Sequence, residues 1–238
     1  MTKLTLCKAV RIKGIELEHT AKGSVNDKKL DCNISRARAK IFEYALCNHW
    51  QWFTTFTLDQ KKYNRHDLEK FRKDFSQYIR NYNKKNGTEI QYLVIPETHK
   101  DGAWHMHGFL MGLPEEHLRL FTLKEKLPKY IRSKIENGQK VYDWNTYREK
   151  FGFTDLEPIF NHEACAKYVT KYVSKTLAED IKEVGAHLYY CSNSLKTAQE
   201  IKRGLLNSEF NSPDYENDYV KVKWYRNANA EVLANMID

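Results

Sequence analysis

The fold of this 238-residue chain is decided by Ile90-Gln-Tyr-Leu-Val-Ile-Pro-Glu97 and Trp104-His-Met-His-Gly-Phe-Leu-Met111, two apolar segments separated by six residues. The connecting segment contains Asp101-Gly102, a dipeptide typical of tight turns between antiparallel strands. We therefore expect a β-hairpin. A hairpin in the middle of the chain favours an antiparallel sheet over repeated β-α-β units.

Hydrophobic spacing outside the hairpin alternates between the periods of helices and strands. We expect helices at residues 35–48, 65–82, 114–121, 163–178 and 195–204, and further strands at residues 50–58, 153–160, 187–191 and 219–226. Residues 1–30 form a basic, irregular lead-in, residues 122–150 show no clean period, and residues 207–218 form a polar, acidic loop. The expected fold class is α+β, with a central antiparallel β-sheet flanked by helices.

The composition is that of a globular, basic protein. A net charge of +8 favours a polyanionic partner, and the 15 tyrosines and 5 tryptophans supply rings that stack on unpaired bases. Many basic proteins have no nucleic-acid partner and many tyrosines belong to cores, so composition alone favours nucleic acid only modestly.

Other features of the sequence exclude several classes of protein. No apolar run is long enough for a transmembrane helix, and the first eight residues lack the apolar stretch of a signal peptide. The five cysteines lie far apart without a Cys-x-x-Cys pair, which favours reduced thiols over a structural zinc ribbon. We expect a cytoplasmic protein with no membrane partner.

His105 and His107 are the first candidate metal ligands. Side chains alternate along a strand, so both imidazoles point to one face of the expected hairpin. A turn near Asp101 places Glu97 opposite His105, which makes Glu97 the candidate third ligand, with His99, nearer the turn, as the alternative. Two imidazoles and a carboxylate suit Mg, Mn or Zn. A bare His-x-His triplet also occurs as two partly exposed histidines on a strand.

A second motif, Tyr168-Val-Thr-Lys-Tyr-Val-Ser-Lys175, carries two phenols and two amines. On a helix, Tyr168 and Tyr172 are neighbours on one face because they are four residues apart. Lys171 and Lys175 flank the same face, and the valines point to another side. A packing role at the boundary of the core is the alternative for both tyrosines.

This combination suits the breaking and rejoining of a phosphodiester. A free phenol has a pKa of about 10 and is a poor nucleophile at neutral pH. A divalent ion, Mg or Mn, would make the phosphate more electrophilic, and Lys171 or Lys175 would stabilise developing charge. Attack leaves a 5′-phosphotyrosine and a free 3′-hydroxyl, so the bond energy is kept. A second tyrosine permits a second transfer.

The motifs, taken in this order, resemble the HUH superfamily of single-strand endonucleases, and within it the rolling-circle replication initiators of phages and plasmids. Phe56-Thr57-Leu58 resembles the first motif, His105-Met106-His107 with its following glycine resembles the metal motif, and Tyr168 to Lys175 resembles the paired-tyrosine motif Y-x-x-x-Y-x-x-K. The resemblance covers residues 50–175. Asp59 departs from the first motif, which often ends in Thr or Ser.

The resemblance implies one HUH endonuclease domain over residues 1–238, with a ferredoxin-like, RRM-like core at about residues 35–190 and extensions at both ends. It implies Tyr168 and Tyr172 as nucleophiles, and it supports Glu97 because related viral initiators carry an acidic ligand at about this place. Tyrosines that follow the histidines favour initiators or related transposases over conjugative relaxases.

The function expected from these features is nicking and rejoining of single-stranded or supercoiled origin DNA. No Gly-x-x-x-x-Gly-Lys-Ser/Thr loop is present, so we expect no nucleotide cofactor and a separate helicase and polymerase. Thr57, Arg36, Arg38 and Lys40 are candidate DNA contacts, as are basic positions in residues 122–150, although such residues also form solvated faces. A single-strand DNA transposase and a non-catalytic nucleic-acid-binding module are the alternatives.

Overall fold

The chain folds into two compact units. The computed structural model describes residues 1–8, 27–174, 177–178, 180–181, 187–216, 220–226 and 229–238. The larger unit lies within Val25–Thr197, and the smaller unit is made from the two ends of the chain. The larger unit contains every residue of the metal and tyrosine motifs.

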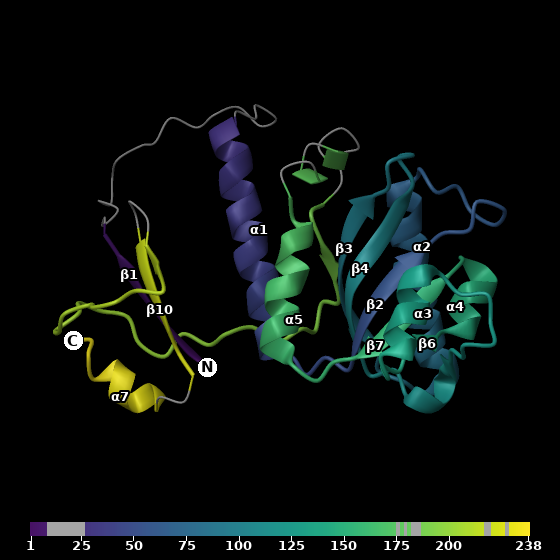
Figure 1. Cartoon of the computed structure of the whole chain (residues 1–238). Helices are drawn as coiled ribbons and strands as arrows, with labels where there is room; N and C mark the ends of the chain where they lie inside the picture. The colour runs from purple at the N-terminus through teal and green to yellow at the C-terminus, as the bar shows by residue number, and fades with distance from the viewer. Residues whose placement is uncertain (9–26, 175–176, 179, 182–186, 217–219, 227–228) are drawn as a thin grey trace. The chain divides into compact units, whose positions relative to one another are not determined.

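An antiparallel sheet forms the centre of the larger unit (Figure 1). Among the described residues it has seven strands in the order β5-β6-β7-β2-β4-β3-β8. The strands are β2 (Trp52–Thr57), β3 (Gln91–Thr98), β4 (Trp104–Met111), β5 (Arg119–Leu120), β6 (Tyr142–Asp143), β7 (Thr154–Pro158) and β8 (Tyr190–Cys191). Helices flank the sheet, so the predicted fold class, α+β with a central antiparallel sheet, is confirmed.

Helices lie on both faces of this sheet. They are α1 (Asp27–Cys47), α2 (Leu68–Asn86), α3 (Lys129–Glu136), α4 (Asn145–Lys150) and α5 (His162–Val169). Helices α1 and α5 lie side by side on one face, and α2 covers the opposite face, where Phe75 packs on Phe56 and Tyr92 (Figure 1). No helix in the described part of the chain combines the length and apolar character needed to cross a membrane.

Strand alternation separates an aromatic face of the sheet from a polar one. Phe56 of β2 lies opposite Met106 of β4, and both side chains are fully buried on the face that α2 covers. The next pair along the same strands, Thr55 and His107, therefore points to the other face, on which α1 and α5 lie. The hydrophobic packing and the candidate chemistry thus occupy opposite sides of one sheet.

Helix α2 has clear sequence-encoded ends. The Asp67 side chain accepts a hydrogen bond from the Lys70 amide, and Gly87 ends the helix in the left-handed conformation at φ 63°. Apolar side chains recur at helical spacing and are buried against the sheet: Leu68, Phe71, Phe75, Tyr78 and Ile79. The helix predicted at residues 65–82 is confirmed, with its end four residues later.

Residues 114–150 differ from the expectation. The helix predicted at residues 114–121 is wrong, because this segment forms one 3-10 turn (Glu115–His117) followed by β5. The segment without a clean period contains α3, β6 and α4, of which the longest has eight residues. Elements this short do not repeat their apolar pattern often enough for periodicity to reveal them.

The tyrosine helix ends earlier than predicted. Helix α5 stops at Val169, a 3-10 turn follows at Thr170–Tyr172, and Val173 leaves helical geometry with ψ 79°. The Thr170 hydroxyl donates to the Lys167 carbonyl at 2.8 Å, and Arg38 Nε of α1 donates to the Val173 carbonyl at 2.9 Å. An arginine from another helix therefore binds a carbonyl that a continuing α-helix would use.

The helix predicted at residues 195–204 is wrong. The backbone of Lys196 is bound by the Asn48 side chain, which accepts from its amide at 2.9 Å and donates to its carbonyl at 3.0 Å. Leu195, next to it, is buried in the core. The side-chain amide of Asn48 satisfies groups that a helix would pair with each other, and residues 195–203 have no regular secondary structure.

The smaller unit contains a second antiparallel sheet. In the described residues its strand order is β1-β10-β9, formed by β1 (Thr2–Cys7), β9 (Tyr215–Glu216) and β10 (Val220–Tyr225), followed by α7 (Ala230–Ala234). The strand predicted at residues 219–226 is confirmed. The predicted lead-in contains β1, and its residues 9–26 lie outside the described residues. The assignment of the whole chain to one domain stays a prediction.

We predict that Gly108→Ala disrupts the central hairpin. A Cβ atom at Gly108 would lie 2.0 Å from the Leu93 carbonyl oxygen and 2.8 Å from the Val94 Cα atom, both in the backbone of β3. We expect a loss of at least about 3 kcal/mol in the free energy of unfolding, measured by chemical denaturation. Gly138→Ala, which meets no atom within 4 Å but sits at φ 79°, is the control and should cost about 1 kcal/mol. Equal losses would contradict the close approach.

Candidate functional site

The hairpin of β3 and β4 brings the three candidate ligands together. Glu97 pairs with His105 in the register, as predicted, and His107 lies one pleat further along β4. The turn between the strands is closed by hydrogen bonds from the His99 amide to the Ala103 carbonyl and from the Gly102 amide to the His99 carbonyl, both 2.9 Å. Local turn geometry therefore fixes the facing of carboxylate and imidazole.

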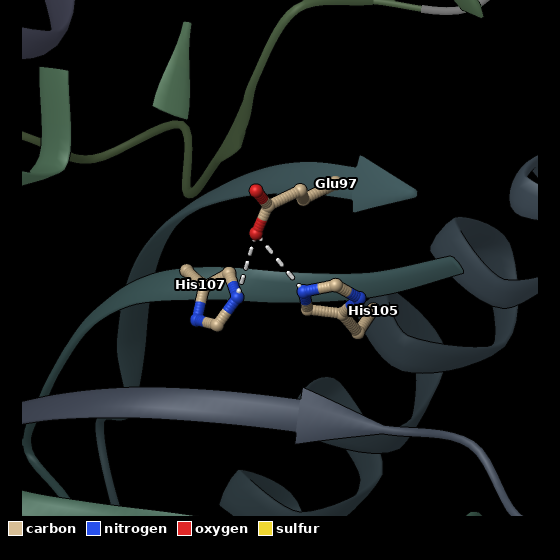
Figure 2. Close-up of side chains that lie close together, drawn as sticks. All are labelled: Glu97, His105 and His107. Atoms are coloured by element: carbon tan, nitrogen blue, oxygen red, sulfur yellow. Dashed lines mark hydrogen bonds and ion pairs between the residues drawn. The ribbon is translucent and has the colours of Figure 1, made fainter. Parts of the chain in front are cut away.

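Both imidazoles point at one carboxylate oxygen (Figure 2). Nε2 of His105 and Nε2 of His107 each lie 3.0 Å from Oε2 of Glu97. Hydrogen bonds from His105 and from His107 hold the pKa of Glu97 down to about 2, against the opposing effect of burial. The imidazoles are largely buried, whereas the Glu97 side chain is 42% exposed, which leaves one side of the cluster open.

This geometry fits a divalent metal ion. The ligand atoms of Glu97, His105 and His107 all lie within 4.8 Å of one another. Adjacent ligands on an octahedral ion with bonds of about 2.1 Å are separated by about 3.0 Å, the spacing found here between nitrogen and oxygen. Two imidazoles and one carboxylate suit Mg, Mn or Zn. The three residues could therefore hold one metal ion.

His99, the alternative third ligand, has a different place. Its ring stacks on His105 with a centroid distance of 4.0 Å, and burial together with His105 lowers its pKa. In the described part of the chain, the only group of three ligand atoms that converges comes from Glu97, His105 and His107. The geometry thus favours Glu97 over His99 as the third ligand.

The two tyrosines of the paired motif lie against this cluster. The Tyr172 ring stacks on His107, with a centroid distance of 4.4 Å and an interplanar angle of 14°. Its hydroxyl donates to the Tyr168 hydroxyl at 3.0 Å, and burial followed by this contact raises the pKa of Tyr172 above its ordinary value. Tyr168 is 48% exposed and packs its ring against Phe53 of β2. The phenols therefore form a hydrogen-bonded pair beside a candidate ligand.

The two lysines of the motif are only partly described. Lys171 is exposed, and its Nζ lies 5.8 Å from the centre of the Tyr168 ring. Lys175 lies outside the described residues. Val169 and Val173, which were expected to face the core, are fully buried.

The basic residues of α1 have distinct environments. Arg36 is exposed, and the Nζ of Lys40 lies 2.9 Å from Glu43. Arg38 donates through Nε to the Val173 carbonyl, so it holds the backbone directly after the tyrosine turn. Arg38 therefore has a structural contact in addition to the exposure expected of a DNA contact.

Two residues of the first motif lie at the end of β2. Thr57 pairs with His105 in the register, which puts its side chain on the face of the metal cluster. Asp59, which departs from the motif, accepts a hydrogen bond from the Lys61 amide at 2.9 Å. Asp59 thus shapes the turn that follows the strand.

Sequence reasoning missed a buried acid on the same face of the sheet. Asp155 of β7 is 1% exposed, pairs with Thr55 in the register, and accepts a hydrogen bond from the Tyr130 hydroxyl at 2.9 Å. Burial raises the pKa of Asp155 to about 6. The Oγ1 atom of Thr55 lies 3.2 Å from Nδ1 of His107. An inward-facing acid within a strand is the only local signal, because the pairing of β7 with β2 is non-local.

Comparison with known families adds to this geometry. Residues 51–177 match the family of the replication-associated protein ORF2. The chain belongs to this family. The matched range covers more than half of the 238 residues and includes β2, the β3–β4 hairpin and the tyrosine turn. The ORF2 family is one of replication proteins, which supports a role in DNA replication. No curated protein and no solved structure shows significant similarity to the chain.

We predict that the protein binds Mn²⁺ and that Glu97 contributes more to this binding than His99. Glu97→Gln removes a ligand charge and should weaken Mn²⁺ binding at least about 100-fold, measured by isothermal titration calorimetry. His99→Ala should change the affinity less than about 10-fold, because the ring only stacks on a ligand. His117→Ala, on a histidine bonded to Tyr82, is the control. The reverse order would make His99 the third ligand.

Proposed function

We propose that this member of the ORF2 family is a replication initiator that nicks and rejoins single-stranded origin DNA through a covalent phosphotyrosine. The observation that carries the proposal is the contact between Tyr172 and His107, with the Tyr172 hydroxyl bonded to Tyr168. A nucleophile for phosphoryl transfer must lie beside the groups that polarise the phosphate. The hairpin and the tyrosine turn supply both parts from distant segments of the chain.

The proposed reaction is a transesterification. A phenolic oxygen attacks the scissile phosphorus, an oxygen–phosphorus bond forms, and the bond from phosphorus to the 3′-oxygen breaks. The proton lost by the phenol is balanced by the proton gained by the 3′-oxygen, which leaves as a 3′-hydroxyl. The 5′-phosphate stays on the tyrosine as a diester. Attack by a 3′-hydroxyl reverses the step and rejoins the strand, so no nucleotide cofactor is consumed.

In this proposal Glu97, His105 and His107 hold Mg or Mn, which polarises the scissile phosphate when bound. The stack of Tyr172 on His107 fixes the position of one phenol, and the hydrogen bond to Tyr168 holds the second phenol beside it. Two adjacent nucleophiles permit a second transfer before the first DNA end is released.

We assign charge stabilisation at the phenols to the lysines of the motif. The amine of Lys171 lies over the Tyr168 ring, so Lys171 is placed to offset negative charge that develops at that phenol. Lys175, which follows in the motif, is proposed for the same role from its place in the sequence.

The expected partners follow from the same assignment. Thr57, Arg36, Arg38 and Lys40 are the proposed contacts to the DNA, with Thr57 on the face that carries the cluster. The substrate is single-stranded or supercoiled origin DNA. The absence of a phosphate-binding loop in the sequence assigns unwinding to a separate helicase and synthesis to a separate polymerase, in the cytoplasm of the cell that carries the replicon.

We predict that the protein forms a covalent adduct with DNA. Single-stranded fragments that tile both strands of the replicon encoding the chain should give a shifted band on a denaturing gel in the presence of Mn²⁺, and chelation should abolish it. Each single variant, Tyr168→Phe or Tyr172→Phe, keeps one nucleophile, whereas the double variant should lose the adduct at least about 1,000-fold.

Tyr215→Phe, in the smaller unit, is the control and should retain the adduct. An adduct that persists in the double variant would contradict the assignment of the nucleophiles. If no fragment gives an adduct although the protein retains single strands on a native gel, the chain is a binding module.

A further inference from the structure

Three strands of the sheet place His107, Thr55 and Asp155 in one row. His107 of β4 pairs with Thr55 of β2, and Thr55 pairs in turn with Asp155 of β7. Residues paired in this way have side chains on the same face, so the row runs from the metal cluster to the buried acid. Glu97 closes one end of the row and Tyr130 closes the other.

Hydrogen bonds connect the members of this row. Nδ1 of His107 lies 3.2 Å from Oγ1 of Thr55, while Nε2 of the same ring faces Glu97 at 3.0 Å. Thr55 also hydrogen-bonds the Asp155 carboxyl group, and the Tyr130 hydroxyl donates to it at 2.9 Å. The ring of His107 thus has the candidate metal on one side and a chain of polar contacts on the other.

The chemistry of the acid sets the direction of these bonds. An ionised carboxylate accepts hydrogen bonds and donates none, so the Thr55 hydroxyl directs its proton to Asp155. The Thr55 oxygen then has a lone pair for a proton on Nδ1 of His107. A neutral imidazole with its proton on Nδ1 has its lone pair on Nε2, the atom that faces Glu97.

The acid has no evident partner of opposite charge. Asp155 forms no ion pair with a lysine or arginine of the described residues, because Lys134, the nearby amine, pairs with Glu157 at 2.7 Å. A carboxylate that is 1% exposed and held only by hydroxyl groups reduces stability relative to an apolar residue of the same size. Packing alone therefore gives no reason for an acid at this position.

The second imidazole provides a contrast. Nδ1 of His105 is buried, and no described residue forms a hydrogen bond with it. The polar row therefore acts on one imidazole and not on the other. It is a specific property of the register between β4, β2 and β7.

We propose that Asp155, acting through Thr55, is a positioning residue that holds His107 in the tautomer whose Nε2 binds the metal ion. This inference rests on the metal centre of the function proposed above. It assigns to Asp155 and Thr55 no contact with the DNA and no direct contact with the ion. Their effect is on the orientation and tautomer of a ligand.

The first test is the affinity for Mn²⁺, measured by calorimetry. Asp155→Leu removes the acceptor and Thr55→Val removes the hydroxyl at almost constant shape, and each should weaken binding about 10- to 100-fold. Thr55→Ser keeps the hydroxyl and should restore affinity to within about 3-fold of the original. Glu157→Leu is the matched control, because it removes a carboxylate from the same face of β7 without a link to His107, and it should leave the affinity unchanged.

Coupling between the two positions separates a relay from general damage. If both residues act through one chain of hydrogen bonds, the double variant Thr55→Val/Asp155→Leu should bind Mn²⁺ no more weakly than the weaker single variant. Fold losses that multiply in the double variant would indicate two independent effects and would overturn the relay.

The tautomer itself is read by nitrogen NMR of the histidine rings in the metal-free protein. His107 should carry its proton on Nδ1 in the original chain and shift towards Nε2 in Asp155→Leu and Thr55→Val, with thermal unfolding as the check of folding. Unchanged tautomer and Mn²⁺ affinity in both variants would overturn the proposal. A tautomer shift in a protein that forms no DNA adduct would overturn the nicking function and support the relay.

Discussion

The pairing of β3 with β4 is the constraint on which the rest of the site depends. It puts Glu97 opposite His105, and it is possible at this distance because Gly108 has no Cβ atom to meet the Leu93 carbonyl. A shift of the register by one residue would move every side chain of β4 to the other face of the sheet. The ligands and the core would then exchange sides, so the same pairing determines both the stability of the sheet and the geometry of the cluster.

The aromatic face of the sheet supports the polar one. Phe56 packs between Phe75 of α2 and Tyr147 of α4, and all three rings are buried. Dense packing beneath the strands restricts movement of the backbone that carries the ligands. Because the metal candidates come from one hairpin, their mutual geometry needs no distant contact. The tyrosines arrive about sixty residues later in the chain, and long-range contacts such as the one from Arg38 hold their turn in place.

These differences explain what the sequence could predict. The hairpin and the facing of Glu97 and His105 follow from a short turn and strand alternation, which are local. The link from His107 to Asp155 depends on β2 pairing with both β4 and β7, and no local pattern shows that register. The failed helix at residues 195–204 has a similar cause, because Asn48, far away in the sequence, binds the backbone there. Tertiary contacts overrode a weak local preference.

The end of α5 makes the two tyrosines unequal. In a continuous α-helix, residues four apart share one face and have similar surroundings. The 3-10 turn at Thr170–Tyr172 winds by about 120° per residue instead of about 100°, so Tyr172 is rotated further round the axis than helical spacing implies. Tyr172 is consequently half-buried on His107, while Tyr168 stays exposed against Phe53. Two identical side chains in a symmetric-looking motif are therefore distinguished by the backbone between them, with one tied to a candidate ligand and the other open to an incoming strand.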